Sequence, residues 1–382
     1  MSRFDELIAE FCPDGVEYRR LGDVANIKRG TRVVKKNLSA SEGYPVFQNS
    51  LAPLGYHTDF NEPAGTPFII CAGAAGEIGY SESEYWAADD CYSIECSEAL
   101  DSKYALHSLL HSQGTLKAQV RKASIPRLSK DVVTRLEIPV PAIEVQHEIA
   151  RILDAFTDLT ADLTAELSCR RQQYAYYRDR LLSRESLEVL DGKPVEMKRL
   201  DEISISIKAG GDVPDDTVKG QTEPTDTHPY PVFSNGSNDK ALYGYCSKYS
   251  IEKESVTISA RGSIGFHSVR KPYFTPVVRL ITVTPDVETI TSAYLDLALT
   301  QTSINGDKGG IPQLTIPKVK GIEIPVPSLE TQRKVVDILD RFDALTTSLT
   351  DGIPAEIEAR KAQNAYYRDR LLDFPRKSGD AS

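Results

Sequence analysis

The stretch EIPVPAIEVQHEIARILDAF, residues 137–156, decides the fold of this chain, because much of it is written twice. The same EIPVP returns at residues 323–327, and Gln146 recurs as Gln332 at the same offset. The tripeptide ILD, and the phenylalanine two residues after it, recur at that offset as well. Similarity in one order at so many positions indicates an internal duplication.

The duplication also covers the segments outside this stretch. YPVFQNS at residues 44–50 matches YPVFSNG at residues 230–236, and EYRRLGDV at residues 17–24 resembles EMKRLDEI at residues 196–203. Each copy is far longer than the repeats of a solenoid or a propeller. We therefore expect a duplicated globular domain, with a long helix after each copy.

The segment after the first EIPVP has the pattern of an amphipathic helix. Ile152, Phe156, Leu159, Leu163 and Leu167 recur at intervals of four and three, in a run that contains the tandem tetrads LTAD and LTAE. Roughly 40 residues without glycine or proline would form a rod about 60 Å long. A helix of that length needs a partner for its apolar stripe, and we expect the second copy to supply it in antiparallel orientation.

The second helix carries four extra residues, because YYRDRLL at residues 176–182 recurs at residues 366–372 with a larger offset than EIPVP. The insertion lies near residues 351–354. Four residues turn a helix by about 400°, which is about 40° past one full turn, so the apolar seam continues. Gly352 and Pro354 predict a kink or a break in the helix there.

These patterns predict an α+β (mixed α/β) fold, with two duplicated globular domains separated by two long helices that pack as an antiparallel coiled coil with pseudo-twofold symmetry. The predicted parts are a first domain at 1–141, a long helix at 142–183, a linker at 184–196, a second domain at 197–327, a second long helix at 328–373 with a kink near 351–354, and a tail at 374–382.

Composition limits the class of protein. The chain has 382 residues and 40% hydrophobic content, which is enough for two or three cores. Its six cysteines show no metal-binding spacing, so we expect reduced thiols in a cytoplasmic protein. No apolar run approaches the length of a membrane span, so we expect none. A net charge of −10 argues against nucleic acid at first sight, but many acids lie in the helical segments and local basic runs lie in the globular halves.

Motifs of catalysis are missing from the sequence. There is no P-loop and no [DN]-P-P-[FYW] loop of an adenine methyltransferase. GAAGEIG at residues 73–79 imitates a cofactor loop, but its repeat partner at residues 260–265 favours a structural turn. His107 and His111 form an i,i+4 pair on a helix that we expect at the surface, so solvated histidines are favoured over a zinc site. We expect no catalytic, cofactor-binding or metal-binding residues.

The order of globular unit, long helix, globular unit and long helix resembles the specificity subunit of type I restriction–modification systems. The residues that carry the resemblance are the paired EIPVP-to-glutamine segments, the LTADLTAEL run, the two YYRDRLL endings and the opening CPDGVEYRRLGDV at residues 12–24. The resemblance extends over roughly residues 4–373.

This resemblance implies a recognition subunit that has no chemistry of its own. Two target recognition domains would each read one half of a bipartite site in double-stranded DNA, and the helices would set the spacer between the halves. The helices would also dock two methyltransferase subunits, and two restriction (translocase–nuclease) subunits would complete the enzyme. S-adenosylmethionine, ATP and magnesium would bind those partners.

The candidate DNA contacts follow from the chemistry of base and phosphate recognition. Arg or Lys reads guanine and Asn or Gln reads adenine, while Lys, Arg and Ser hold phosphates. The two matched polar turns after YPVF are equally well explained as ordinary turn chemistry. The predicted contacts are Lys28, Arg29, Arg32, Lys35, Lys36, Gln48, Asn49, Arg121, Lys122 and Arg127 in the first domain, and Lys208, Ser234, Asn235, Asn238, Arg261 and Gln313 in the second.

Two other classes of function stay open at this point. A duplicated scaffold that binds protein or carbohydrate would share the repeat but would have no affinity for DNA, even with its partners present. A solitary enzyme is disfavoured by the motif search, and the duplicated units leave little length for a fused catalytic domain.

Overall fold

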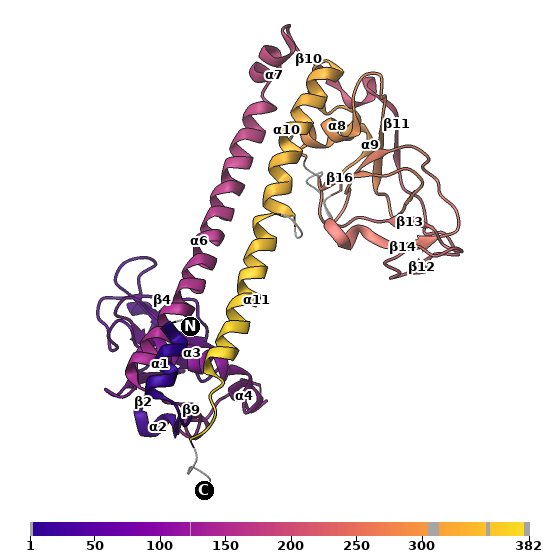
Figure 1. Cartoon of the computed structure of the whole chain (residues 1–382). Helices are drawn as coiled ribbons and strands as arrows, with labels where there is room; N and C mark the ends of the chain where they lie inside the picture. The colour runs from indigo at the N-terminus through magenta and orange to yellow at the C-terminus, as the bar shows by residue number, and fades with distance from the viewer. Residues whose placement is uncertain (1–2, 123, 305–312, 349–351, 378–382) are drawn as a thin grey trace. The chain divides into compact units, whose positions relative to one another are not determined.

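The computed structural model describes residues 3–122, 124–304, 313–348 and 352–377. The chain divides into two compact units, of which unit 1 comprises Met1–Ala165 with Glu356–Ser382 and unit 2 comprises Glu166–Ala355. Each unit holds one globular domain of mixed strands and helices together with segments of both long helices (Figure 1). The predicted α+β class with two duplicated domains is confirmed.

Unit 1 is built on two small sheets. The strand order is β2-β8-β5-β6 in the larger sheet and β4-β3-β7 in the smaller one, and β1 pairs separately with β9. The strands are β1 (Tyr18–Arg20), β2 (Ala25–Arg29), β3 (Tyr44–Phe47), β4 (Gly55–His57), β5 (Phe68–Ile70), β6 (Ile78–Gly79), β7 (Trp86–Ala87), β8 (Cys91–Cys96) and β9 (Glu137–Pro139). The helices are α1 (Arg3–Phe11), α2 (Leu21–Val24), the 3₁₀ turn η1 (Lys35–Asn37), α3 (Ser102–His111), α4 (Gln113–Ala118) and α5 (Lys130–Thr134), followed by α6 (Ile143–Leu181).

Unit 2 repeats this arrangement. Its sheets have the orders β11-β18-β15-β16 and β12-β14-β13-β17, and β10 pairs with β19. The strands are β10 (Glu196–Arg199), β11 (Ser204–Ala209), β12 (Val218–Lys219), β13 (Tyr230–Phe233), β14 (Leu242–Cys246), β15 (Ser255–Ile258), β16 (His267–Arg270), β17 (Thr275–Pro276), β18 (Ile281–Pro285) and β19 (Glu323–Val326). The helices are α7 (Arg184–Asp191), the 3₁₀ turns η2 (Leu200–Glu202) and η3 (Asn238–Ala241), α8 (Ser292–Leu299), α9 (Ile316–Lys320), α10 (Leu329–Thr347) and α11 (Ile353–Leu372).

The cores form where short apolar runs meet one helix. All residues of β5 (FII) are buried, because Ile69 on one face of the strand packs in one hydrophobic cluster and Phe68 and Ile70 on the other face pack in a second. Tyr104 of α3 is fully buried and donates a hydrogen bond from its hydroxyl to the carbonyl of Pro139 at 2.9 Å. In unit 2, Tyr294 of α8 donates the same bond to Pro325 at 3.0 Å. The EIPVP segments thus connect each core to the long helix that follows.

A buried glutamine joins the domain to the helix in each unit. Gln146 is fully buried; its Oε1 accepts from the N–H of Asp101, and its Nε2 donates to the carbonyls of Ala99 and Pro141. The distances are 2.9, 2.9 and 2.8 Å. Gln332 makes the equivalent bonds at 3.0, 2.9 and 3.0 Å, with Thr291, Thr289 and Pro327. The recurrence of this glutamine in the sequence therefore has a structural cause.

The long helices pack in antiparallel pairs within each unit. In unit 1, Phe156 of α6 stacks on Tyr367 of α11 with ring centroids 5.2 Å apart. One residue further along α6, Thr157 accepts a hydrogen bond from Asn364 at 3.4 Å, so the two helices run in opposite directions. In unit 2, Tyr177 of α6 lies against Phe342 of α10 at 6.0 Å. The predicted antiparallel helix packing is confirmed within the units.

In the second long helical segment, α10 ends at Thr347 and α11 begins at Ile353. At Gly352 a Cβ atom would lie 2.9 Å from the carbonyl oxygen of Ala344, so only glycine fits this approach. Pro354 is the second residue of α11, where a missing N–H leaves no intrahelical bond unmade. The predicted kink includes residue 351, which lies outside the described residues.

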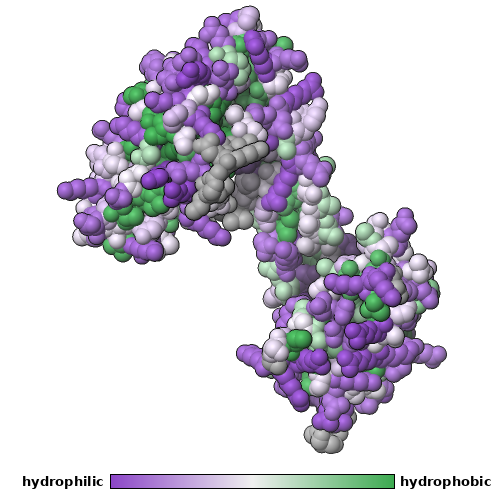
Figure 2. Space-filling view, turned by 180° about the vertical axis from the view of Figure 1, so that it is seen from behind, coloured by the Kyte–Doolittle hydropathy of each residue, from purple (hydrophilic) through white to green (hydrophobic). Residues whose placement is uncertain are grey.

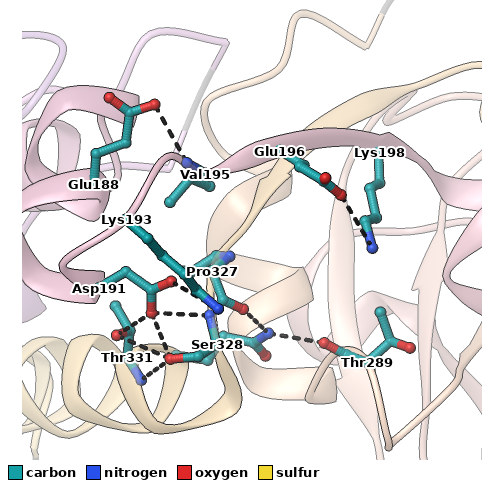
Figure 3. Close-up of polar contacts among 11 residues, drawn as sticks. Glu188, Asp191, Lys193, Val195, Glu196, Lys198, Thr289, Pro327, Ser328 and Thr331 are labelled. Atoms are coloured by element: carbon teal, nitrogen blue, oxygen red, sulfur yellow. Dashed lines mark hydrogen bonds and ion pairs between the residues drawn. The ribbon is translucent and has the colours of Figure 1, made fainter.

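Unit 2 has a further link between α7 and α10, shown in Figure 3. Asp191, the last residue of α7, has a side chain that is 1% exposed. Its Oδ1 accepts from the N–H of Ser328 at 3.0 Å and from the Thr331 hydroxyl at 2.7 Å, and the Ser328 hydroxyl also donates to it. Ser328 is the N-cap of α10, so the carboxylate lies at the positive end of that helix.

We expect Asp191→Ala to lower the free energy of unfolding of unit 2 by about 2–3 kcal/mol, because it removes three accepted hydrogen bonds at a helix N-terminus. The bonds from Ser328, then those from Thr331, lower the pKa of Asp191 below its ordinary value of 3.8. A carboxyl with a lowered folded-state pKa stabilises above its unfolded pKa, and this contribution is lost as the pH falls through the folded value.

The measurement is urea unfolding with hydrogen exchange in α10, at neutral pH and below pH 4. Asp215→Ala serves as the control, since Asp215 is an exposed carboxyl of the same unit. An Asp191→Ala protein with unchanged stability at neutral pH would show that water replaces these bonds.

The surface is largely polar. Hydrophilic side chains cover most of the face in Figure 2, and hydrophobic ones are interspersed among them. Among the described residues, no helix is long and apolar enough to cross a membrane.

Candidate nucleic-acid interface

The basic run of unit 1 separates into two groups in the structure. Lys28 and Arg29 end β2, whereas Lys35 and Lys36 begin the 3₁₀ turn η1 and are exposed, as is Arg32. The Lys28 ammonium is paired with Glu95 at 2.8 Å, and this hydrogen bond raises the pKa of Lys28.

Three predicted arginines from distant parts of the sequence meet at one pocket of unit 1. Arg29, Arg121 and Arg127 line a pocket of about 230 Å³ together with Tyr92 and other residues. The backbones of Arg121 and Arg127 bond to each other, with the N–H of Arg121 donating to Arg127 at 2.9 Å and the reverse bond at 3.2 Å. The sequence segments that supply these arginines are thus held together by backbone pairing. Lys122 is exposed next to Arg121.

The next predicted residues, Gln48 and Asn49, lie in the polar turn that follows β3. The Gln48 side chain is half-buried, and its Nε2 lies 3.5 Å from a carboxylate oxygen of Asp90. The carbonyl of Asn49 accepts a hydrogen bond from the N–H of Ala74 at 2.9 Å, while its side chain belongs to an exposed residue. Asn49 is therefore better placed than Gln48 to reach a ligand.

In unit 2 the structure brings together three of the predicted residues. The Arg261 guanidinium donates to Oε1 of Gln313 at 3.0 Å. Asn235 accepts from the N–H of Ala260 at 2.7 Å, and its Nδ2 donates to the carbonyl of Val278 at 2.6 Å. Both ends of the Asn235 amide are occupied, so this residue positions the Arg261 loop, whereas Arg261 is exposed and Gln313 is half-buried.

The other predicted residues of unit 2 are Ser234, which directly precedes Asn235, and Asn238 and Lys208. The N–H of Ser234 bonds to the carbonyl of Ala241 at 2.8 Å, and Asn238 begins η3. Lys208 lies exposed on β11, opposite Thr282 of β18. Among the described residues, no hydrogen bond or ion pair joins the Lys208 side chain to Arg261 or Gln313.

Two residues beside Asn235 were not predicted from the sequence. Val278 and Arg279 have left-handed backbones, with φ of 53° and 62°, and the carbonyl of Val278 is the one that Asn235 holds. A β-branched residue at positive φ is strained, and such strain is frequent at functional sites. Arg279 is exposed, and the strand registers place it where unit 1 has Asp90. No turn motif in the sequence predicts this loop.

The expectation that His107 is solvated is wrong. His107 is 2% exposed, and its Nε2 lies 2.8 Å from a carboxylate oxygen of Asp154 in α6. Burial lowers the pKa of His107, although the Asp154 carboxylate acts in the opposite direction. The expectation holds for His111, which is exposed and pairs with Asp369 at 3.0 Å. Both histidines face the long helices, because α3 packs on them.

A match to a known family accompanies this geometry. A family model described as the type I restriction modification DNA specificity domain matches residues 13–168 and again residues 192–359. A putative type I specificity subunit of Mycoplasma pneumoniae is 29% identical over 360 residues, which cover 93% of this chain and 97% of that relative. The specificity subunit of the Escherichia coli enzyme EcoR124I/EcoR124II is 28% identical, with 94% and 95% covered.

Solved structures share the fold. The crystal structure of the type I restriction–modification S subunit from M. genitalium matches with a TM-score of 0.60 at 19% identity, and the match covers 94% of this chain and 96% of that chain. A chain from a structure concerned with complex assembly and conformational transition of the type I R-M system matches with a TM-score of 0.58 at 18% identity, with 94% and 98% covered.

Proposed function

This chain belongs to the type I restriction modification DNA specificity family, and on that premise we propose how it recognises DNA. It is the DNA sequence-specificity subunit of a type I restriction–modification system. We infer that each globular domain reads one half of a bipartite, gapped site in double-stranded DNA. The family model supports this inference, because it matches the chain twice, once for each domain.

The observation that carries the proposal is one scaffold with two different sets of polar side chains. Residues such as Gln146 and Gln332 make the same buried bonds in both units. At the surface, Arg127 follows an Ile-Pro in the first domain where Gln313 follows one in the second. Because the polar side chains differ at equivalent places, the same fold can present different surfaces to two different half-sites.

The two long helical segments carry matching exposed side chains. Tyr176 and Tyr366 are 58% and 59% exposed, and each accepts a hydrogen bond from an arginine one turn later, at 3.3 Å from Arg180 and at 3.5 Å from Arg370. Two equal surfaces on one chain suit two copies of the same partner. We propose that these helices set the spacer and dock two methyltransferase subunits, which bind S-adenosylmethionine. Two restriction subunits, which bind ATP and magnesium, would join the full complex.

The test is a map of adenine methylation by single-molecule sequencing. The chain is co-expressed with the methyltransferase subunit of its own system, and a matched culture expresses the methyltransferase subunit alone. We expect a methylated, gapped two-part motif that appears only when the chain is present.

A stable complex without new methylation would argue against DNA specification by this chain. A chain that forms no complex and binds no DNA would instead support the scaffold interpretation. Methylation of a single, ungapped motif would contradict the assignment of one half-site to each domain.

A further inference from the structure

The arginine pocket of unit 1 has a rigid frame. Arg127 is held on both sides, because its backbone pairs with Arg121 and forms a bridge with Ala72. The next N–H, of Leu128, donates to the carbonyl of Cys71 at 2.9 Å. Arg29 enters from the end of β2, where its Nε donates to the carbonyl of Asp89 at 2.8 Å. The backbone positions of all three arginines are therefore set by the sheet and its flanking bridge.

The guanidinium groups in this pocket have no carboxylate partner among the described residues. With the Nε of Arg29 bonded to a backbone carbonyl, both of its terminal NH₂ groups remain for a ligand. Two aspartates lie beside this pocket: the carbonyl of Asp89 bonds to Arg29, and the carbonyl of Asp90 accepts a hydrogen bond from the N–H of Cys71 at 2.7 Å. Three arginines against two aspartates leave an excess of positive charge around the pocket.

We propose that this pocket binds one phosphate group of the DNA backbone beside the first half-site, an inference that rests on the proposed function. A guanidinium offers two parallel N–H groups that match two phosphate oxygens, and such charge-assisted bonds are the strong ones. Three guanidinium groups around one pocket suit a compact oxyanion better than the flat edge of a base. Arg29, Arg121 and Arg127 then fix the position of the first domain on the DNA and carry no sequence information.

Unit 2 differs at two of the three positions. Arg29 lies opposite Tyr92 in the β2–β8 pair, and the equivalent place in the β11–β18 pair is Ala209, opposite Ile281. The counterpart of Arg127 is Gln313, whose side chain accepts a bond from Arg261. The first domain therefore has arginines at two positions where the second has alanine and glutamine, so this pocket belongs to the first domain.

The test replaces each arginine by the residue of unit 2, in the complex with its methyltransferase subunit. We expect Arg29→Ala and Arg127→Gln each to weaken binding of the complex to its own site about tenfold at low salt. The slope of log K against log salt should fall by about one, because one phosphate contact is lost. The methylated motif should stay the same. Arg135→Gln is the control, since Arg135 is 74% exposed and pairs with Asp131 one turn away.

Two results would overturn the proposal while the proposed function stands. If Arg127→Gln relaxes or changes one base of the first half-site, then Arg127 reads a base. If both variants keep the affinity and the salt slope of the unchanged complex, then the pocket does not touch the DNA backbone. If the complex with the unchanged chain methylates no gapped motif, the proposed function itself is refuted.

A free anion is distinguished by a separate arm with inorganic phosphate. The melting temperature of the chain is compared in phosphate and in chloride at equal ionic strength, with and without Arg127→Gln. Stabilisation by phosphate that disappears in the variant, together with unchanged DNA binding, would assign the pocket to a free phosphate and refute the DNA contact. Lost DNA affinity with a reduced salt slope supports the backbone contact.

Discussion

Gln146→Leu is expected to lower the free energy of unfolding of unit 1 by about 2–4 kcal/mol, because three backbone groups lose their partner. These groups are the N–H of Asp101 and the carbonyls of Ala99 and Pro141, and the glutamine side chain that joins them is fully buried. Leucine is one atom shorter than glutamine and can neither donate nor accept. Urea unfolding followed by hydrogen exchange, with α3 and the first turns of α6 as probes, measures the loss.

The duplication supplies a matched control. Gln332→Leu removes the same three kinds of bond in unit 2, so it should cost a similar amount while leaving exchange in unit 1 unchanged. Gln172→Leu changes an exposed glutamine of α6 and should have little effect. A loss below about 1 kcal/mol for Gln146→Leu would mean that the site relaxes around leucine and satisfies these groups in another way.

The second large effect concerns DNA. Deleting residues 159–162, the LTAD tetrad of α6, is expected to shorten the gap of the recognised site while both half-sites stay the same. The deletion removes about 6 Å of helix and leaves the rest rotated by about 40°, and one base pair rises about 3.4 Å. The gap should therefore shrink by about two base pairs. All buried residues of α6 precede the deleted tetrad, so the core of unit 1 keeps its contacts.

A deletion of three residues is the control for this experiment. Removing residues 159–161 rotates the following helix by about 300°, which turns the apolar stripe about 60° away from its partner. We expect this variant to lose methylation, whereas the four-residue deletion keeps it with a shorter gap. Methylation mapping of both variants gives the answer. A change in either half-site after the four-residue deletion would refute the role of the helix as a spacer.

The duplication, the long helices and the class of fold could be predicted from the sequence alone. Local patterns carry this information, since helical periodicity at Ile152, Phe156 and Leu159 depends only on neighbouring residues. The kink expected near Gly352 and Pro354 rests on the same kind of information, because glycine and proline act on their own backbone. The recurrence of Gln146 as Gln332 is visible in the sequence, but the bonds that explain it are seen only in the structure.

Which polar side chains come together could be learned only from the folded chain. Arg29 and Arg127 lie far apart in the sequence, and the register of β2 with β8 and the bridge to Arg121 bring them to one pocket. His107 lies inside because the packing of α3 against α6 selects which face of α3 is covered. Strand register and helix packing depend on contacts between distant segments, so the sequence pattern of any one segment does not contain them.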